Sequence, residues 1–292
     1  MIEPTLPALP NGLPWQLNPY LLLDGVRVNA LPRQLYQWSD APIFSPLFLG
    51  TRWKGLADLS PCLVALQGRL DPILPGFLSQ AARESGYLIF TSASFDKTLQ
   101  HLRGLLEVNP GAGQTAHLRL ADPAAVQPLF ALGERAFFGP IEQVCLPDGL
   151  ERCWHWHQRS GPCTTDLQAQ PYRLSEAELA ALEAVPLRQL IKVLDQHLRA
   201  YFPAYLPGLS GADRHRHLRT LTSQGFRQGL CSERDMLLFA NISAFLGGLP
   251  AENHVGITYL LDAPSPLSPS QRVEQAARLA ERHATHREQV RP

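Results

Sequence analysis

The sequence predicts an α/β N-terminal lobe with a mixed sheet flanked by helices, followed by a mainly α-helical C-terminal lobe. In the first part of the chain, apolar runs typical of buried strands alternate with segments that carry apolar residues at helical spacing. A polar stretch punctuated by Pro and Gly begins near residue 160, and helical spacing dominates beyond it. We therefore predict an α/β domain at residues 1–160, a linker at 161–171 and a helical lobe at 172–292.

The expected elements of the first lobe are short and follow one another closely. The apolar run at residues 20–23 ends at Asp24-Gly25, which is a turn signal. Ser94 stands where it would cap a helix whose apolar face includes Phe95 and Leu99. The expected strands are residues 20–23, 62–66, 87–90, 117–121, 141–146 and 152–158, and the expected helices are residues 31–38, 72–84, 95–106 and 123–136.

The second lobe carries start and stop signals of helices. Ser175 followed by Glu178 has the spacing of a capping box. Residues 187–201 keep one apolar stripe at helical spacing, with Pro186 suited to the first turn. A further helix follows Ser232 and stops at Gly247-Gly248, and a weakly amphipathic one starts at Ser268.

Composition excludes several classes of partner. The chain has 26 Lys and Arg against 26 Asp and Glu, so its formal charge is zero and we expect no nucleic-acid partner. No apolar run approaches the ~18 residues of a membrane helix, and no signal peptide is visible. We therefore expect no membrane partner and a cytoplasmic protein, in which the 5 widely spread cysteines are reduced thiols. Phosphate-binding, dinucleotide-binding and hydrolase motifs are absent, so we expect no cofactor, no catalytic residue and no small-molecule substrate.

The sharpest candidate for metal binding is Cys153-Trp154-His155-Trp156-His157. On a strand, the cysteine and both histidines point to one face, where a thiolate and two imidazoles could hold zinc. With Cys163 the spacing still matches no common zinc pattern, and the same alternation describes a half-buried strand whose tryptophans face the core. We expect no metal here, and a zinc-dependent regulatory module remains an alternative.

Short motif blocks follow one another through the first half of the chain. They are Asp24-Gly25 after an apolar strand, Leu47-Phe48 before a small-residue turn, Pro61 within residues 60–64, His101-Leu102-Arg103 on a helix, Arg119 with Asp122-Pro123, and Phe138-Gly139-Pro140. In this order and spacing they resemble the effector chaperone/adaptor family of type VI secretion systems, over about residues 20–140. The chain departs from the family pattern near Arg119, where leucines stand in place of an aromatic residue, and after Pro123, where Ala124 replaces a basic one.

The resemblance implies a function without catalysis. It implies a cytoplasmic adaptor that binds a cognate effector toxin and assists its loading onto the VgrG spike. Because the family pattern ends near residue 140, we expect the helical lobe to select the cargo. The motif residues are then structural or partner-binding.

Two further interpretations concern the acidic residues at strand ends. Arg119 and Asp122 would either border a surface that meets the spike or cargo, or form an ion pair and cap that hold the turn into the next helix. We favour the second, because Asp before Pro caps helices and an arginine in an apolar strand needs a partner. Asp24, Asp58 and Asp122 could instead be the acids of a hydrolase with an unrecognised catalytic set, although turn and cap formation explains each of them.

Overall fold

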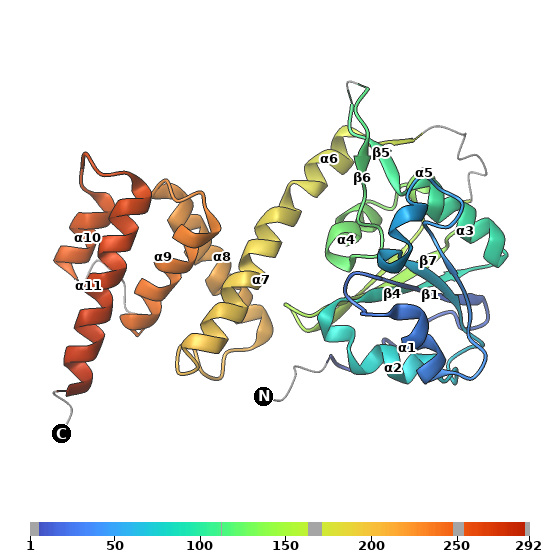
Figure 1. Ribbon diagram of the computed structural model, residues 1–292, viewed down its shortest axis with the longest axis horizontal. Coiled ribbons are helices and arrows are strands. Elements are labelled where there is room, and N and C mark those ends of the chain that lie inside the picture. Colours follow the sequence, from blue (N-terminus) through green and yellow to red (C-terminus); the bar gives the residue numbers. More distant parts are fainter. Residues whose placement is uncertain (1–5, 112, 163–170, 248–253, 290–292) are drawn as a thin grey trace. The chain divides into compact units, whose positions relative to one another are not determined.

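The chain folds into two compact units, Met1–Val185 and Pro186–Pro292. The computed structural model describes residues 6–111, 113–162, 171–247 and 254–289. Most of the expected linker, at residues 163–170, lies outside this described part, as do Cys163 and Gly248. The α/β character of the first unit and the helical character of the second are confirmed (Figure 1).

The first unit is built on a six-stranded sheet with the order β2-β3-β1-β4-β7-β8, in which neighbouring strands pair antiparallel. The mixed pairing lies in a smaller sheet, β6-β5-β9, where β5 pairs antiparallel with β6 and parallel with β9. The strands of the large sheet are β1 (Asn18–Leu23), β2 (Ile43–Pro46), β3 (Cys62–Ala65), β4 (Gly86–Thr91), β7 (Gln143–Asp148) and β8 (Cys153–Gln158), and those of the small sheet are β5 (Glu107–Asn109), β6 (Ala116–His117) and β9 (Tyr172–Arg173).

Helices cover both faces of the large sheet (Figure 1). Tyr20 and Leu22 of β1 enter one apolar core, while Leu21 and Leu23 enter the core on the opposite face, as the two-residue period of a strand requires. Burial on both sides explains why β1 and β4 are continuous apolar runs in the sequence. The helices are α1 (Leu31–Trp38), α2 (Ile73–Ser79), α3 (Phe95–Gly104), α4 (Pro123–Ala131), α5 (Arg135–Phe138) and α6 (Glu176–Leu182), with 3-10 helices η1 (Lys54–Leu59) and η2 (Ala81–Arg83).

Two expected helices are interrupted. The segment predicted as one helix at residues 72–84 is α2 followed by η2, because Gln80 leaves helical geometry and Glu84 turns the chain into β4 with a positive φ of 58°. The segment predicted at 123–136 breaks after α4, where Gly133 has a φ of 69°, and resumes as α5.

The border between the units lies beyond the expected start of the helical lobe. β9 pairs with β5, and Leu174 is buried in the core of the first unit beside Leu179 of α6. The predicted capping box of α6 is present, since Ser175 and the Glu178 side chain cap each other's backbone N–H. The segment after β9 therefore belongs to the α/β unit.

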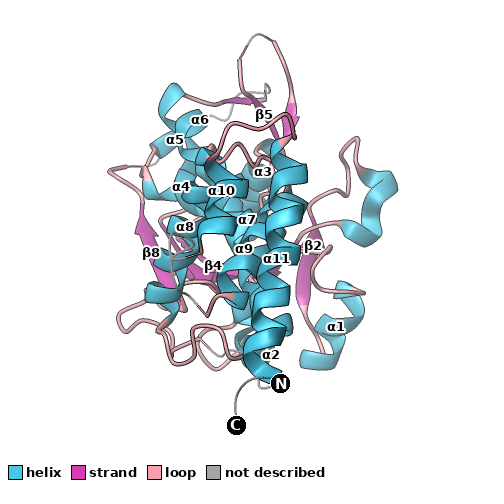
Figure 2. Ribbon diagram, turned by 90° about the vertical axis from the view of Figure 1, so that its left-hand side faces the viewer, coloured by secondary structure: helices cyan, strands magenta, loops and turns pink. Residues whose placement is uncertain are grey.

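The second unit consists, in its described residues, of helices (Figure 2). They are α7 (Ala184–Tyr201), α8 (Gly211–Arg227), α9 (Glu233–Phe245), α10 (Val255–Asp262) and α11 (Pro269–Gln289). The expected stripe on α7 buries Ile191, Leu194 and Leu198, whereas Tyr201 at its end is 72% exposed. No helix in the described ranges is both long and apolar enough to cross a membrane.

Candidate functional site

Arg27 stands at the centre of a buried group of charges in the first unit. Its guanidinium lies 3.0 Å from Asp122 Oδ2, 3.6 Å from Glu84 Oε2 and 3.8 Å from Asp24 Oδ2. Arg119 approaches the same group from outside, 3.4 Å from Asp122 Oδ2 and 3.9 Å from Asp24 Oδ2. We call these five residues the Arg27 cluster.

Local backbone geometry places each acid of the cluster. Asp24 follows β1, and its Oδ1 accepts the N–H groups of Val26 at 2.8 Å and of Arg27 at 3.3 Å. Gly25 is needed beside it, because a Cβ there would overlap the backbone of Ser60. Asp122 is the N-cap of α4, with Pro123 at the first helical position and Oδ1 accepting the Ala124 N–H at 3.2 Å.

The acids of the cluster are occupied by protein partners. The three acidic residues are at most 5% exposed, and each lies within ion-pair distance of an arginine. Glu84 Oε1 also accepts the Gly149 N–H at 3.0 Å, which ties the turn between β7 and β8 to the cluster. Buried carboxylates need such partners to remain charged. Asp58, the third acid considered from the sequence, is exposed on η1 and is not a member of the cluster.

A second network surrounds α3 and joins three other motif blocks. His101 lies buried with Nε2 2.9 Å from the carbonyl oxygen of Phe137, so Nε2 carries the donated hydrogen. Burial lowers the pKa of His101 to about 4, against the opposing effect of the Phe137 carbonyl, and the ring is therefore neutral near pH 7. Gly139 passes so close that a Cβ there would overlap the imidazole.

Arg103 connects α3 to the Leu-Phe block. Its Nε donates to the carbonyl of Leu47 at 3.1 Å and its Nη2 to that of Pro46 at 3.1 Å. The Leu47 N–H in turn donates to the Pro61 carbonyl at 2.8 Å, and the Phe48 N–H donates to Ser60 Oγ at 3.0 Å. Leu102, which stands between His101 and Arg103 in the sequence, is fully buried in the core.

The predicted motif residues thus fall into two networks inside the first unit. One holds Asp24, Gly25, Arg119, Asp122 and Pro123, and the other holds Phe48, Pro61, His101, Leu102 and Arg103. All are buried except Arg103, which is half-buried, and Arg119, whose side chain is 57% exposed. Their contacts hold neighbouring segments together, and Arg119 is the member that presents its charge to solvent.

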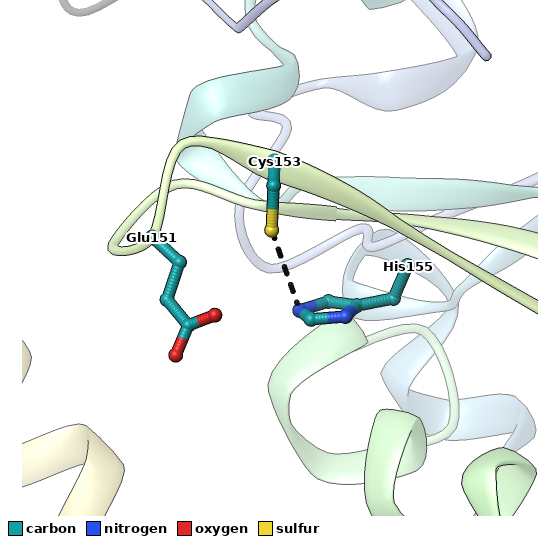
Figure 3. A group of neighbouring side chains, drawn as sticks. All are labelled: Glu151, Cys153 and His155. Carbon is teal, nitrogen blue, oxygen red and sulfur yellow. Dashed lines mark hydrogen bonds between the residues drawn. The ribbon is translucent and has the colours of Figure 1, made fainter. Parts of the chain in front are cut away.

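The turn between β7 and β8 gathers Glu151, Cys153 and His155 (Figure 3). Their ligand atoms lie within 4.8 Å of one another, and Cys153 Sγ is 3.7 Å from His155 Nε2. Asp148 shapes this turn, because its Oδ1 accepts the N–H groups of Leu150 at 2.8 Å and Glu151 at 2.7 Å. Its Oδ2 lies 3.3 Å from the same His155 Nε2.

The strand alternation expected from the sequence is present in β8. The rings of His155 and His157 stack with centroids 6.2 Å apart, on the face that carries Cys153. Trp154 packs against the opposite core as expected, but Trp156 is 42% exposed because β8 is the edge strand. Burial lowers the pKa of His157, and the neighbouring His155 adds to this.

Sequence reasoning missed three residues of these groups. Arg27 lies in a loop after β1 and Glu84 in a turn, so neither stands at a strand end or in a motif block. Glu151 lies in the hairpin turn rather than at an alternate strand position, and strand periodicity therefore does not include it. The Asp-Gly pair at positions 148 and 149 was the available signal of a turn between the two strands.

Comparison with known proteins finds two similarities. Residues 19–136 match the family described as "Domain of unknown function (DUF4123)". Over 275 residues the chain is 27% identical to the accessory protein VasW of Vibrio cholerae. The aligned region covers 93% of this chain and 90% of that protein. No solved structure matches. Together these findings support the resemblance to type VI secretion effector adaptors that the motif order indicates.

Proposed function

We propose that this chain is a non-enzymatic, cytoplasmic chaperone/adaptor that binds a cognate effector toxin and assists its loading onto the VgrG spike. The similarity to an accessory protein along 93% of the chain carries the proposal, because it extends far beyond the DUF4123 region into the helical unit. The internal contacts of the motif residues agree with it, since a scaffold shared by many adaptors needs the same packing whatever its cargo.

Three acidic residues lie close together, as the hydrolase alternative requires, but their surroundings do not suit catalysis. Asp24, Glu84 and Asp122 do converge, yet each is within reach of a guanidinium and is almost fully buried. A catalytic pair needs one carboxyl group poised to give up or take a proton and a space for substrate beside it. The ion pairs of the Arg27 cluster favour a structural role instead.

Co-purification tests the proposal directly. We expect the full chain to form a stable complex with the effector encoded beside its gene, and that complex to capture the neighbouring VgrG. The control is an effector from an unrelated secretion cluster, which should not bind. A protein that binds neither this effector nor this VgrG and hydrolyses a generic ester, phosphodiester or peptide would contradict the proposal.

The helical unit offers an exposed apolar face suited to a cargo segment. Val255 and Tyr259 stand one turn apart on α10 and are 82% and 70% exposed. An amphipathic helix of an effector would bury such side chains in the way that helix-in-groove complexes do. We expect the double substitution Val255→Ser with Tyr259→Ser to weaken capture of the effector without changing the fold.

A matched control comes from the first unit. Leu70 is 97% exposed, so Leu70→Ser removes a comparable apolar group elsewhere and should leave effector capture unchanged. Exchange of residues 186–292 for those of a related adaptor extends the test, because it replaces the second unit as a whole. We expect the chimera to change its cargo and to keep its VgrG. If cargo preference instead stays with the first unit, the assignment of the two units is reversed.

A further inference from the structure

We propose that Glu151, Cys153 and His155 form a binding site for a thiophilic divalent metal ion of the Zn²⁺ class at the β7–β8 turn. In the described part of the chain, this is the group where a sulfur, an imidazole nitrogen and a carboxylate oxygen come within 4.8 Å of one another. The site is independent of the adaptor role. It also revises the expectation drawn from strand spacing, which counted the cysteine and histidines but not the residue in the turn.

The distances between the donors fit tetrahedral zinc. Zinc bonds of about 2.3 Å to sulfur and about 2.0 Å to nitrogen place those two donors about 3.5 Å apart in a tetrahedron. The observed separation of Cys153 Sγ and His155 Nε2 is 3.7 Å. An ion can therefore sit between the two side chains with little movement of β8.

The third donor can close on the ion from the turn. Glu151 is exposed, and Figure 3 shows its carboxylate on the same side of the hairpin as the thiol and the imidazole. Because its side chain has several rotatable bonds, a change of rotamer can bring an oxygen to the bonding distance of about 2.0–2.2 Å. Three protein ligands leave the fourth position to water, as in other zinc sites with an open position.

Asp148 lies beside the proposed ion. Its Oδ1 is committed to the turn, while Oδ2 lies 3.3 Å from His155 Nε2. On binding, the Cys153 thiol releases its proton to solvent, and the His155 proton resides on Nδ1 so that Nε2 can coordinate. Coordination by Nε2 replaces its contact with Asp148, whose carboxylate remains close enough to offset part of the positive charge of the ion.

A metal-free hydrogen bond between Cys153 and His155 explains the same separation, so the test must register the thiolate–metal bond itself. The full chain, stripped with chelator and kept reduced, is titrated with Co²⁺ alone while absorption is recorded. We expect a single equivalent to produce a near-ultraviolet thiolate-to-cobalt charge-transfer band, and Zn²⁺ to abolish that band by displacement.

Matched variants locate the site. Cys153→Ser should remove the band, and Glu151→Gln should weaken Zn²⁺ binding by at least the ~10–100-fold that loss of an outer partner costs. Cys231→Ser removes an exposed thiol of the second unit, and His157→Gln removes the neighbouring imidazole. Both controls should keep the band, and circular dichroism checks that every variant is folded. Absence of the band in the native chain, or its persistence in Cys153→Ser, overturns the proposal.

Discussion

Removal of the Arg27 charge should destabilise the first unit more than removal of any exposed arginine. The substitution Arg27→Met keeps an aliphatic side chain at this position but deletes the guanidinium. Of the arginines in the cluster only Arg119 then remains, beside Asp24 and Asp122, and the carbonyls of Arg83 and Glu84 lose a donor at 3.0 and 3.2 Å. The perturbation leaves buried charge without compensation, which is the costly way to break an ion pair.

The magnitude follows from burial. Removing one partner of a buried pair costs about 3–5 kcal/mol, and the Arg27 side chain keeps some exposure, so we expect a loss near the lower end, about 3 kcal/mol. Arg27 is 19% exposed against 57% for Arg119, which contacts two of the same acids. Arg119→Met is therefore the matched control and should cost less than about 1 kcal/mol.

Urea unfolding followed by tryptophan fluorescence reports this change selectively. All 5 tryptophans of the chain lie in the first unit, at positions 15, 38, 53, 154 and 156, so the signal follows that unit alone. With a denaturant slope of about 2–3 kcal/mol/M, the midpoint should fall by about 1 M or more in Arg27→Met.

A double-mutant cycle separates charge from packing. Asp122→Asn keeps a capping oxygen for α4 and removes one carboxylate of the cluster, so it should recover part of the Arg27→Met loss. If the two effects add within ~0.5 kcal/mol, or if Arg27→Met costs no more than Arg119→Met, the cluster does not stabilise the fold through charge.

Three further predictions concern packing and caps in the first unit. The pKa of His101 is about 4 in the folded chain and 6.5 in the unfolded chain, so the unfolded chain binds more protons between these pH values. The contribution of neutral His101 to the free energy of unfolding should therefore be fully present above pH 6.5 and fall by roughly 3 kcal/mol toward pH 4. Urea unfolding would detect this fall, and His101→Gln should abolish it. Gly139→Ala should lower the thermal midpoint more than Gly50→Ala, since both have positive φ but only Gly139 would overlap another side chain. Ser175→Ala should cost about 1 kcal/mol by removing the capping box of α6, again measured in urea, and no measurable loss would refute the role of that cap.

Local patterns were sufficient to predict β1, β4 and α7. β1 and β4 are uninterrupted apolar runs because helices cover both sides, and α7 shows its stripe because one face is solvated. The order of strands and the pairing of β9 with β5 depend on contacts between distant segments, which no local period encodes. The pairing of β9 with β5 thus joins residues 172–173 to the first compact unit, which extends to Val185.

The candidate sites were predictable to the same extent. Alternation along β8 placed Cys153 and His155 on one face, but the position of Glu151 depends on how Asp148 folds the turn. Likewise, Asp122 before Pro123 predicted a helix cap, whereas its partner Arg27 lies 95 positions away in the sequence. A loop arginine has no periodic signature, so only the fold reveals it.

The burial of most motif residues bears on how cargo recognition could vary under the proposed adaptor function. His101, Asp122 and their partners hold the α/β unit together, so substitution there should weaken cargo capture only in proportion to lost stability. Val255 and Tyr259 are exposed on α10, and their substitution should weaken capture while the unfolding midpoint of the helical unit, followed by circular dichroism, stays constant. Recognition can then change at the exposed positions without endangering the scaffold, because specificity is set by differences in a few contacts. Plotting effector affinity against stability for both sets of variants would separate them into two lines, and a single common line would show that capture depends on the scaffold itself.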